Sequence, residues 1–564
     1  MTPNTNIARG WRRGREGMAL LTATMFMAVA MVILGALAIR VINQSNQTSH
    51  YERYRAVFHG LEAALAHGVV QIEAGNPGHV GAEAWEPPLG VDDALPAFGD
   101  AGIEPLTLPG QPNVEFFAYV VDWGSDGVDN NGDGTVDGPE EQGWYTIHCY
   151  ARWGSVQRRA EAVMRSDDVN VWRNAIFAGS GQAGGLINGN VSIHGSVHLL
   201  GENVAEGGTS IAALDLSGTS LVHNNYGELS SNLRQRVPPL PQRMYEGEMV
   251  ETLHANLRVK SGLVSLSGNS EIGSPHVPGS GEKGPMDGTF VNDGWTGNST
   301  IDDGGRGVPT RVTSDNGWNQ RYDLGERVPF PLLDHDYRDS VYGHTLENPD
   351  TLANYSHDEF FSEVLAGEPY DGDITIHARN TDEFYYNATN PDSTDPGERQ
   401  STDNYIYYNG DEKVLYVNGP VIVDGNLSLT GQGSDRTIHY NGRAAWLVRG
   451  DVDLDANLYT VNSDGSVTQS FPHNNILGIM AEGSMMVGGS AQLTLMGAFY
   501  AENQIATQRQ STILGTFVSN YFDMGTNVPS IFQIPTLADN LPEGMIGAYP
   551  IRVLSRVSWR EIGG

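Results

Sequence analysis

The sequence has 564 residues, too many for one ordinary hydrophobic core, so we expect two or three domains. Its 68 acidic and 33 basic residues give a net charge of −35, which disfavours nucleic acid and anionic lipid as partners of the folded body. The single cysteine, Cys149, excludes an intrachain disulfide, and the 69 glycines have no three-residue period, which excludes collagen and favours short strands joined by turns.

Residues 1–17 form a basic leader that we expect to stay in the cytoplasm. The stretch from Met18 to Ile39 carries no charged side chain. As a helix it is about 33 Å long, enough to cross a hydrocarbon layer of ~30 Å. Because arginines precede the span, we expect the chain beyond Arg40 to lie outside the cytoplasm, which predicts a single-pass protein of a bacterial inner membrane.

The predicted helix continues beyond the membrane and covers residues 18–75. Proline is absent between Pro3 and Pro77, and apolar residues recur at steps of three and four from Tyr54 to Ile72. This spacing predicts an amphipathic extension whose apolar stripe packs on a following domain. A cleaved signal peptide is the alternative, with mature chains starting at Ile39.

Two stretches resemble a known family. Arg15-Glu16-Gly17 followed by Met18-Ala-Leu-Leu-Thr resembles the leader junction of type IV prepilins, and Arg55-Ala-Val-Phe-His-Gly-Leu is similar to the second half of the N-terminal module of PilX-type minor pilins and pilus assembly proteins. The resemblance implies that a prepilin peptidase cuts between Gly17 and Met18. The pilin family has Glu at the fifth mature position, whereas this sequence has Thr22, which implies a minor or initiating subunit.

Residues 76–170 are predicted to form a small strand-rich module with an aspartate-rich calcium loop. Counted from Asp129, oxygen ligands occupy the EF-hand positions, with Gly134 at the turn. The predicted ligands are Asp129, Asn131, Asp133, the main-chain carbonyl of Thr135, Asp137 and Glu140. The flanking segments 116–121 and 144–151 are rich in aromatic and β-branched residues, so the loop is predicted to join two strands. The alternative is a solvated acidic turn that holds no metal.

The remaining chain is predicted to be mainly β. Gly478, Gly497 and Gly515 follow one another at intervals of 19 and 18 residues within similar apolar stretches. A repeat of that length, made of short strands, predicts a right-handed parallel β-helix, with a β-sandwich as the lesser alternative. Two β-helix segments are predicted, over 171–273 and 413–535. A Gly/Pro/Asp-rich insertion is predicted between them, over 274–412, and a C-terminal cap or tail over 536–564.

Some polar residues could belong to an enzyme, because β-helices host polysaccharide lyases and glycosidases. Asp451, Asp453 and Asp455 alternate along a predicted strand and would share an outward face about 7 Å apart. They could serve paired-carboxylate hydrolysis, bind calcium or form a solvated ladder. His194 and His198 are also predicted to face outward, about 13 Å apart and too far for one metal.

The predicted function is that of a non-enzymatic, type IV pilin-like minor pilin or pilus assembly protein. It would present a calcium-stabilised β-helix for pilus assembly, adhesion or surface organisation. Its expected partners are other pilin-like subunits, the pilus assembly machinery, prepilin peptidase, the membrane and surface carbohydrate. The alternative function is a membrane-anchored carbohydrate-active lyase or hydrolase.

Overall fold

The computed structural model describes most of the chain and divides it into two compact units. The helix–sheet module comprises Met1–Ser166 and Leu554–Gly564, and the β body comprises Asp167–Val553. The described residues are 8–73, 78–80, 83–84, 95–123, 126, 128–130, 143–181, 192–202, 212–297, 300–301, 308–309, 311–318, 320–325, 328–338, 345–524, 529–549 and 551–562.

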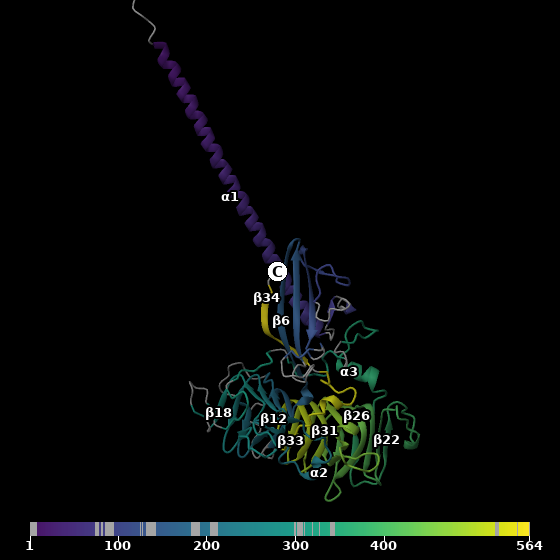
Figure 1. The fold of residues 1–564 in the computed structure, drawn as a ribbon. Coiled ribbons are helices and arrows are strands. Elements are labelled where there is room, and N and C mark those ends of the chain that lie inside the picture. Colours follow the sequence, from purple (N-terminus) through teal and green to yellow (C-terminus); the bar gives the residue numbers. More distant parts are fainter. Residues whose placement is uncertain are drawn as a thin grey trace, which may run out of the picture. The chain divides into compact units, whose positions relative to one another are not determined.

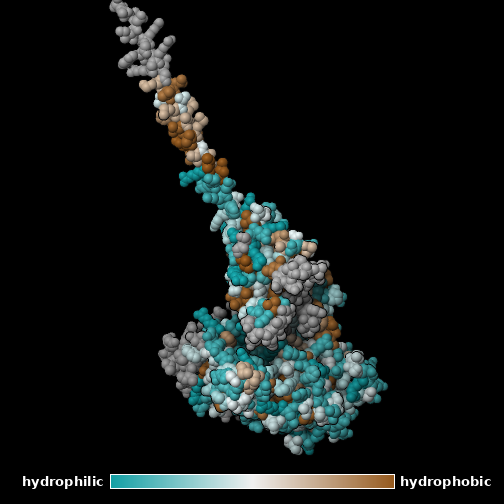
Figure 2. Space-filling view, in the orientation of Figure 1, coloured by the Kyte–Doolittle hydropathy of each residue, from teal (hydrophilic) through white to brown (hydrophobic). Residues whose placement is uncertain are grey.

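A single helix, α1 (Ala8–Glu73), runs through the predicted span and its amphipathic extension (Figure 1). The apolar side chains between Met18 and Ile42 are exposed, and Figure 2 shows them as a hydrophobic stretch along the helix. The most apolar window of 18 residues has a mean hydropathy of 2.5 and none of it is buried. Within the described part of the chain, α1 is the one helix long and apolar enough to cross a membrane, so the prediction of a long apolar N-terminal helix is confirmed.

The helix–sheet module contains a five-stranded sheet in the order β3–β4–β5–β6–β34. Strands β4 and β5 pair antiparallel, as do β5 and β6. The two predicted strands that flank the aspartate loop therefore exist and form one hairpin. The strand bounds are β3 (Leu106–Leu108), β4 (Gln111–Asp122), β5 (Trp144–Trp153), β6 (Val156–Val169) and β34 (Ile551–Ile562), and a separate hairpin pairs β1 (His79–Val80) with β2 (Glu83–Ala84).

The last strand of the chain belongs to this module and not to the β body. Figure 1 shows β34 beside β6, although the whole β body separates the two strands in the sequence. Residues 536–564 were predicted to be a C-terminal cap or tail, and within them 551–562 form a strand of the module's sheet. Leu554 is buried in the core of the module and Trp559 packs against that core, so this strand turns an apolar face into the core.

The β body is built from parallel ladders of short strands (Figure 1). The first ladder contains the initial parts of β24 (Val414–Val423), β26 (Thr437–Val448), β31 (Thr494–Thr507) and β32 (Thr512–Asp523), with β28 (Asn457–Thr460), β33 (Ser530–Phe532), β8 (Ser192–His194), β11 (Leu221–His223) and β16 (Glu271–Ile272). The second contains the following parts of the same four long strands, with β29 (Ile476–Ala481), β7 (Ile176–Gly181), β9 (Val197–Leu199), β14 (Asn256–Val259) and β17 (Gly288–Val291).

A third ladder contains the ends of β31 and β32 and four short strands. These are β21 (Ile374–His377), β25 (Leu427–Thr430), β27 (Val452–Asp455) and β30 (Ser484–Val487). A three-stranded parallel sheet joins β10 (Ala212–Leu216), β15 (Leu263–Leu266) and β18 (Trp295–Gly297). Beyond β24, the antiparallel strands β23 (Tyr405–Asn409) and β22 (Phe384–Asn387) follow.

The chain enters the stack of strands in its middle. β7, an early strand of the body, pairs with β32, and β8 pairs with β33, the last strand of the body's ladders. The segment 176–297 therefore continues the ladders of the segment 374–532. The predicted insertion 274–412 contributes strands β17, β18 and β21, so the ladders extend past the predicted boundaries at 273 and 413. These strands are only three or four residues long and show too little alternation to stand out.

The remaining elements of the β body are short. They are α2 (Ser231–Arg234), β12 (Gln242–Tyr245), β13 (Glu248–Glu251), β19 (Thr300–Ile301), β20 (Val308–Pro309), α3 (His357–Phe360), the 3-10 turns Val171–Arg173, Pro396–Glu398 and Ala538–Asn540, and the π-helical turns Phe361–Leu365 and Ser470–Asn474. The interior is filled by inward side chains of the ladders, with Trp446, Tyr440 and Phe499 fully buried.

Glycines occupy the corner between the first and second ladders. Gly195, Gly442 and Gly515 have φ angles of +139°, +113° and +144°, which side chains with a Cβ rarely adopt. A Cβ atom at Gly442 would lie 1.9 Å from the Val417 carbonyl oxygen, and one at Gly515 would lie 1.8 Å from the Gly497 carbonyl oxygen. The corner therefore requires glycine for both backbone conformation and space.

Candidate functional site

The second half of α1 packs on β4 and β5 through a row of small residues. Ala56, Gly60, Ala64 and Gly68 recur every fourth position, and all four are buried. A Cβ atom at Gly60 would lie 2.8 Å from Ala151 Cβ, so the helix backbone approaches the sheet closely. The predicted stripe of large residues contributes Val57, Leu61 and Ile72 to this contact, whereas the small residues between them were not recognised in the sequence. Their four-residue spacing was the signal that could have found them.

Thr22 lies in the exposed apolar half of α1, where the pilin family has Glu. Its hydroxyl donates a hydrogen bond to the Met18 carbonyl oxygen within the helix. The side chain is therefore satisfied by its own helix and carries no charge. Gly17 and Met18 both lie inside α1, and Met18 is 69% exposed.

The aspartate loop begins and ends at a pair of stacked tryptophans. The rings of Trp123 and Trp144 lie 5.4 Å apart and nearly parallel, and Trp123 Nε1 donates to Thr146 Oγ1 at 2.8 Å. At the start of the loop, Asp126 accepts hydrogen bonds from the Val128 amide and the Asn130 side chain. Of the predicted calcium ligands, Asp129 is described, and Asn131, Asp133, Thr135, Asp137 and Glu140 lie outside the described residues.

The carboxylates considered for an enzyme have structural partners. Asp451 Oδ1 accepts the Ser484 amide at 2.7 Å, and Asp455 accepts the Ser490 amide at 3.0 Å and pairs with Arg436. Burial, together with the charge of Asp455, raises the pKa of Asp453. In the part of the chain that the structure describes, no three His, Cys, Asp or Glu side chains are grouped to hold a metal ion. Asp451 and Asp455 thus connect neighbouring rungs of the ladders.

His194 and His198 do not face solvent, so that prediction was wrong. They are 0% and 2% exposed. Gly195 turns the chain between them and places them in different ladders, where other parts of the β body cover each ring. His198 Nε2 bonds to the hydroxyl of Tyr322 at 2.8 Å, and burial lowers the pKa of His198 well below its ordinary value.

The neighbourhood of His194 combines a serine, a histidine and a glutamate. Ser192 Oγ lies 2.9 Å from His194 Nε2 and 2.7 Å from a Glu228 carboxylate oxygen, and His194 Nδ1 faces the Asn225 carbonyl oxygen at 2.6 Å. The hydrogen bond with His194 is the main cause that lowers the pKa of Glu228 to about 2. Because His194 is closed off from solvent and its ring stacks on Phe532, the group joins adjacent rungs and offers no exposed nucleophile.

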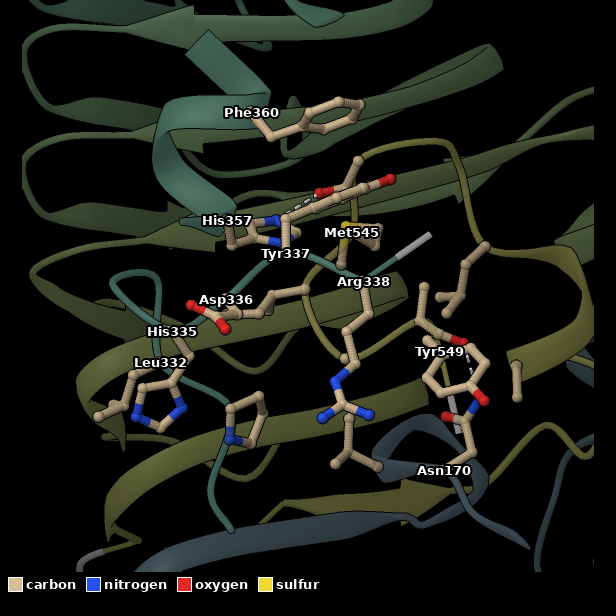
Figure 3. Close-up of a pocket in the computed structure, with 18 of the residues that line it drawn as sticks. Asn170, Leu332, His335, Asp336, Tyr337, Arg338, His357, Phe360, Met545 and Tyr549 are labelled. Carbon is tan, nitrogen blue, oxygen red and sulfur yellow. Dashed lines mark hydrogen bonds between the residues drawn. The ribbon is translucent and has the colours of Figure 1, made fainter. Parts of the chain in front are cut away.

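The β body contains a cleft of about 1130 Å³ between residues 329–338, α3 and residues 538–549 (Figure 3). The Tyr337 ring stacks on Phe360 with centroids 3.9 Å apart. His357 Nε2 donates to the Gly544 carbonyl oxygen at 2.9 Å and so connects two walls of the cleft. Burial lowers the pKa of His357 to about 4, which leaves its ring neutral at pH 7. Figure 3 shows the Arg338 side chain extending into the cleft.

Charged side chains around the cleft are mostly acidic. The acidic lining residues are Asp334, Asp336, Asp539 and Glu543, and the basic ones are Arg173 and Arg338. Arg173 pairs with Asp539 at 3.2 Å. The arrangement can hold a small polar ligand and disfavours an anionic one. None of these residues had been singled out in the sequence, because the loops that bring them together lie about two hundred residues apart.

The comparisons with known proteins identify no family. No protein-family model matches the chain, and no curated protein matches its sequence. Among solved structures, the chain is similar to the competence-associated pilin ComZ from Thermus thermophilus, with 18% identity and a TM-score of 0.45. The match covers 91% of this chain and 96% of that one. A likeness at that TM-score carries no argument about this chain.

Proposed function

We propose that the chain is a type IV pilin-like minor pilin or pilus assembly protein. The observation that carries this proposal is the difference between the two halves of α1. Its first half is apolar and exposed, whereas its second half is built into the core of the helix–sheet module. An exposed apolar helix must be covered by lipid or by other apolar helices, and both environments suit a subunit that leaves the membrane to join an assembly.

The β body is the part that this protein would present outside the cytoplasm. The stacked parallel ladders and glycine corners support its interpretation as a β-helix, and the right-handed form belongs to the proposal. Its role would be pilus assembly, adhesion or surface organisation. The proposed partners are other pilin-like subunits, the assembly machinery, prepilin peptidase and surface carbohydrate, with α1 anchored in the bacterial inner membrane and its N-terminus in the cytoplasm.

Processing at the Gly17–Met18 bond tests the proposal. We expect mass spectrometry of the exported protein to find Met18 as its first residue. The variant Gly17→Val should keep the full leader, because prepilin peptidases of the resembled family cut after glycine, whereas Gly35→Val should be processed normally. A mature chain that starts at Ile39 would support a signal peptide and overturn the pilin-like function.

We also propose that the aspartate loop binds calcium in a structural role. Hard oxygen ligands at EF-hand spacing suit this ion, and the hairpin with its stacked tryptophans would hold both ends of the loop. The ion would fix a long connection between β4 and β5. It would therefore stabilise the sheet on which α1 packs.

Removal of calcium is expected to lower the melting temperature of the module. At a calcium concentration of one hundred times Kd, bound ion contributes about 2.7 kcal/mol. EGTA should lower the melting temperature of the wild-type protein and leave Asp133→Ala unchanged. Asp464→Ala, in an acidic turn elsewhere, is the control and should respond to EGTA like the wild type. A wild-type protein indifferent to EGTA would identify the loop as a plain turn.

A further inference from the structure

A lysine lies fully buried between two aspartates near one end of the β body. The Lys283 side chain is 0% exposed, and its Nζ atom lies 2.5 Å from Asp287 Oδ1 and 2.6 Å from Asp315 Oδ2. The same nitrogen lies 4.8 Å from the centre of the Tyr245 ring. Burial of a charged group is costly unless the group is paired and hydrogen-bonded, and both carboxylates lie within bonding distance of this amine.

Lys283 and Asp315 come from neighbouring rungs of the parallel stack. The Lys283 amide donates to the Glu251 carbonyl oxygen, and the Asp315 amide donates to the Met286 carbonyl oxygen. Met286 and Ser314 form a parallel bridge, so the segment around Asp315 lies beside the segment that carries Lys283. The two segments already lie side by side. A covalent bond between the two side chains could therefore join two rungs without a large movement of the backbone.

The two carboxylates have different surroundings. Asp287 also accepts hydrogen bonds from Asn224 and His254, each at 3.0 Å. Burial alone would raise the pKa of Asp287, but the hydrogen bonds from His254 and Lys283 hold it well below its usual range, so Asp287 stays ionised. Its Oδ1 is the carboxylate oxygen nearest to Nζ, at 2.5 Å, and its low pKa means that it passes a proton on and does not keep it.

Asp315 has a hydrogen-bond donor on its other oxygen. The Tyr245 hydroxyl donates to Asp315 Oδ1 at 3.1 Å. Burial, followed by the hydrogen bond to Asp315, raises the pKa of Tyr245 to about 12, so the hydroxyl keeps its proton at neutral pH. A donor at this oxygen would stabilise the negative charge that forms when a nucleophile adds to the carboxyl carbon.

We propose that Lys283 and Asp315 form an intramolecular isopeptide bond. Asp287 Oδ1 takes a proton from Nζ, and the freed amine attacks Cγ of Asp315 while Tyr245 holds Oδ1. The Nζ–Cγ bond forms and the Cγ–Oδ2 bond breaks. Oδ2 leaves as water with two protons that come from Nζ, the first relayed by Asp287 and the second lost from the nitrogen as the amide forms. One ammonium and one carboxylate become one secondary amide and one water molecule, so the step needs no co-reactant and leaves the net charge of the protein unchanged.

Peptide mass spectrometry of the full-length protein tests this bond independently of the pilin-like function. After tryptic digestion, we expect one branched peptide that contains Lys283 and Asp315 and weighs one water less than its two parts. Trypsin should not cleave after Lys283 in that species. Lys413 and Asp435, an exposed pair at 2.9 Å, serve as an internal control and should appear as separate peptides.

Two variants assign the roles. Asp315→Ala should yield free Lys283 peptides. Asp287→Asn should lower the linked fraction in freshly made protein, because an amide cannot relay the proton that leaves Nζ. Free Lys283 peptides in folded wild-type protein would overturn the proposal. So would a water loss confined to the Asp287-Gly288 peptide, because that result identifies a succinimide. An unchanged linked fraction in Asp287→Asn would overturn the role given to Asp287.

Discussion

The substitution Gly515→Ala is expected to destabilise the β body by about 2–5 kcal/mol. The residue has a φ of +144°, and a Cβ atom there would lie 1.8 Å from the Gly497 carbonyl oxygen. A left-handed backbone costs a residue with a Cβ about 1–2 kcal/mol. The clash adds roughly 1–3 kcal/mol, because the contacted atom belongs to the backbone of the adjacent rung and cannot turn aside.

A matched glycine separates the two costs. Gly465 has a φ of +79°, and a Cβ atom added there would meet no other atom within 4 Å, so Gly465→Ala should cost only the conformational part of about 1–2 kcal/mol. The measurement is urea denaturation of both variants, with hydrogen exchange of peptides from β31 and β32 to locate the loss. Equal stability of the two variants would contradict the close approach at the corner.

Acidification from pH 7 to pH 4 is expected to destabilise the β body by several kcal/mol. Burial lowers the pKa of His357 to about 4. Burial, followed by the charge of neighbouring His194, lowers the pKa of His223 to about 4 as well. In the unfolded chain both rings take up a proton near pH 6.5. The unfolded chain therefore binds protons that the folded protein does not bind as the pH falls from 6.5 towards 4. The free energy of unfolding is at its full value above pH 6.5 and falls by about 3 kcal/mol for each ring.

The variant His357→Gln should remove about 3 kcal/mol of this pH dependence. Glutamine can still donate to the Gly544 carbonyl oxygen but does not titrate. His335, half of whose side chain is exposed on the same cleft, is the control, and His335→Gln should keep the wild-type slope. Urea midpoints measured between pH 7 and pH 4 give the comparison. A His357→Gln protein with the wild-type slope would show that this ring does not carry the effect.

Local patterns in the sequence were sufficient to predict the long helix and the strands beside the aspartate loop. The uncharged stretch from Met18 to Ile39 and the absence of proline predicted one long helix, and α1 confirms it. The segments beside the aspartate loop were predicted as strands and form the β4–β5 hairpin. The glycine period near the end of the chain is reflected in the register of Gly497 against Gly515, whereas Gly478 pairs one position away, with Ala498.

The candidate sites depended on contacts that no local pattern contains. His194 has the alternation of an outward residue, yet its ring is buried against Phe532, which lies more than three hundred residues further along the chain. Lys283 was not singled out, because a lysine in a glycine-rich stretch has the appearance of a surface residue. Its burial follows from the arrival of Asp315 on the next rung.

Periodicity, charge and turn residues thus determined from the sequence alone that an apolar helix leads into a mainly β protein with one acidic hairpin loop. Only the tertiary structure decided that β7 enters the stack beside β32 and that β34 returns to the sheet of the helix–sheet module. The physical reason lies in the parallel ladder. Main-chain hydrogen bonds can pair any two strands whose apolar faces match. The order of the rungs is therefore set by packing over the whole body and not by neighbours in the sequence.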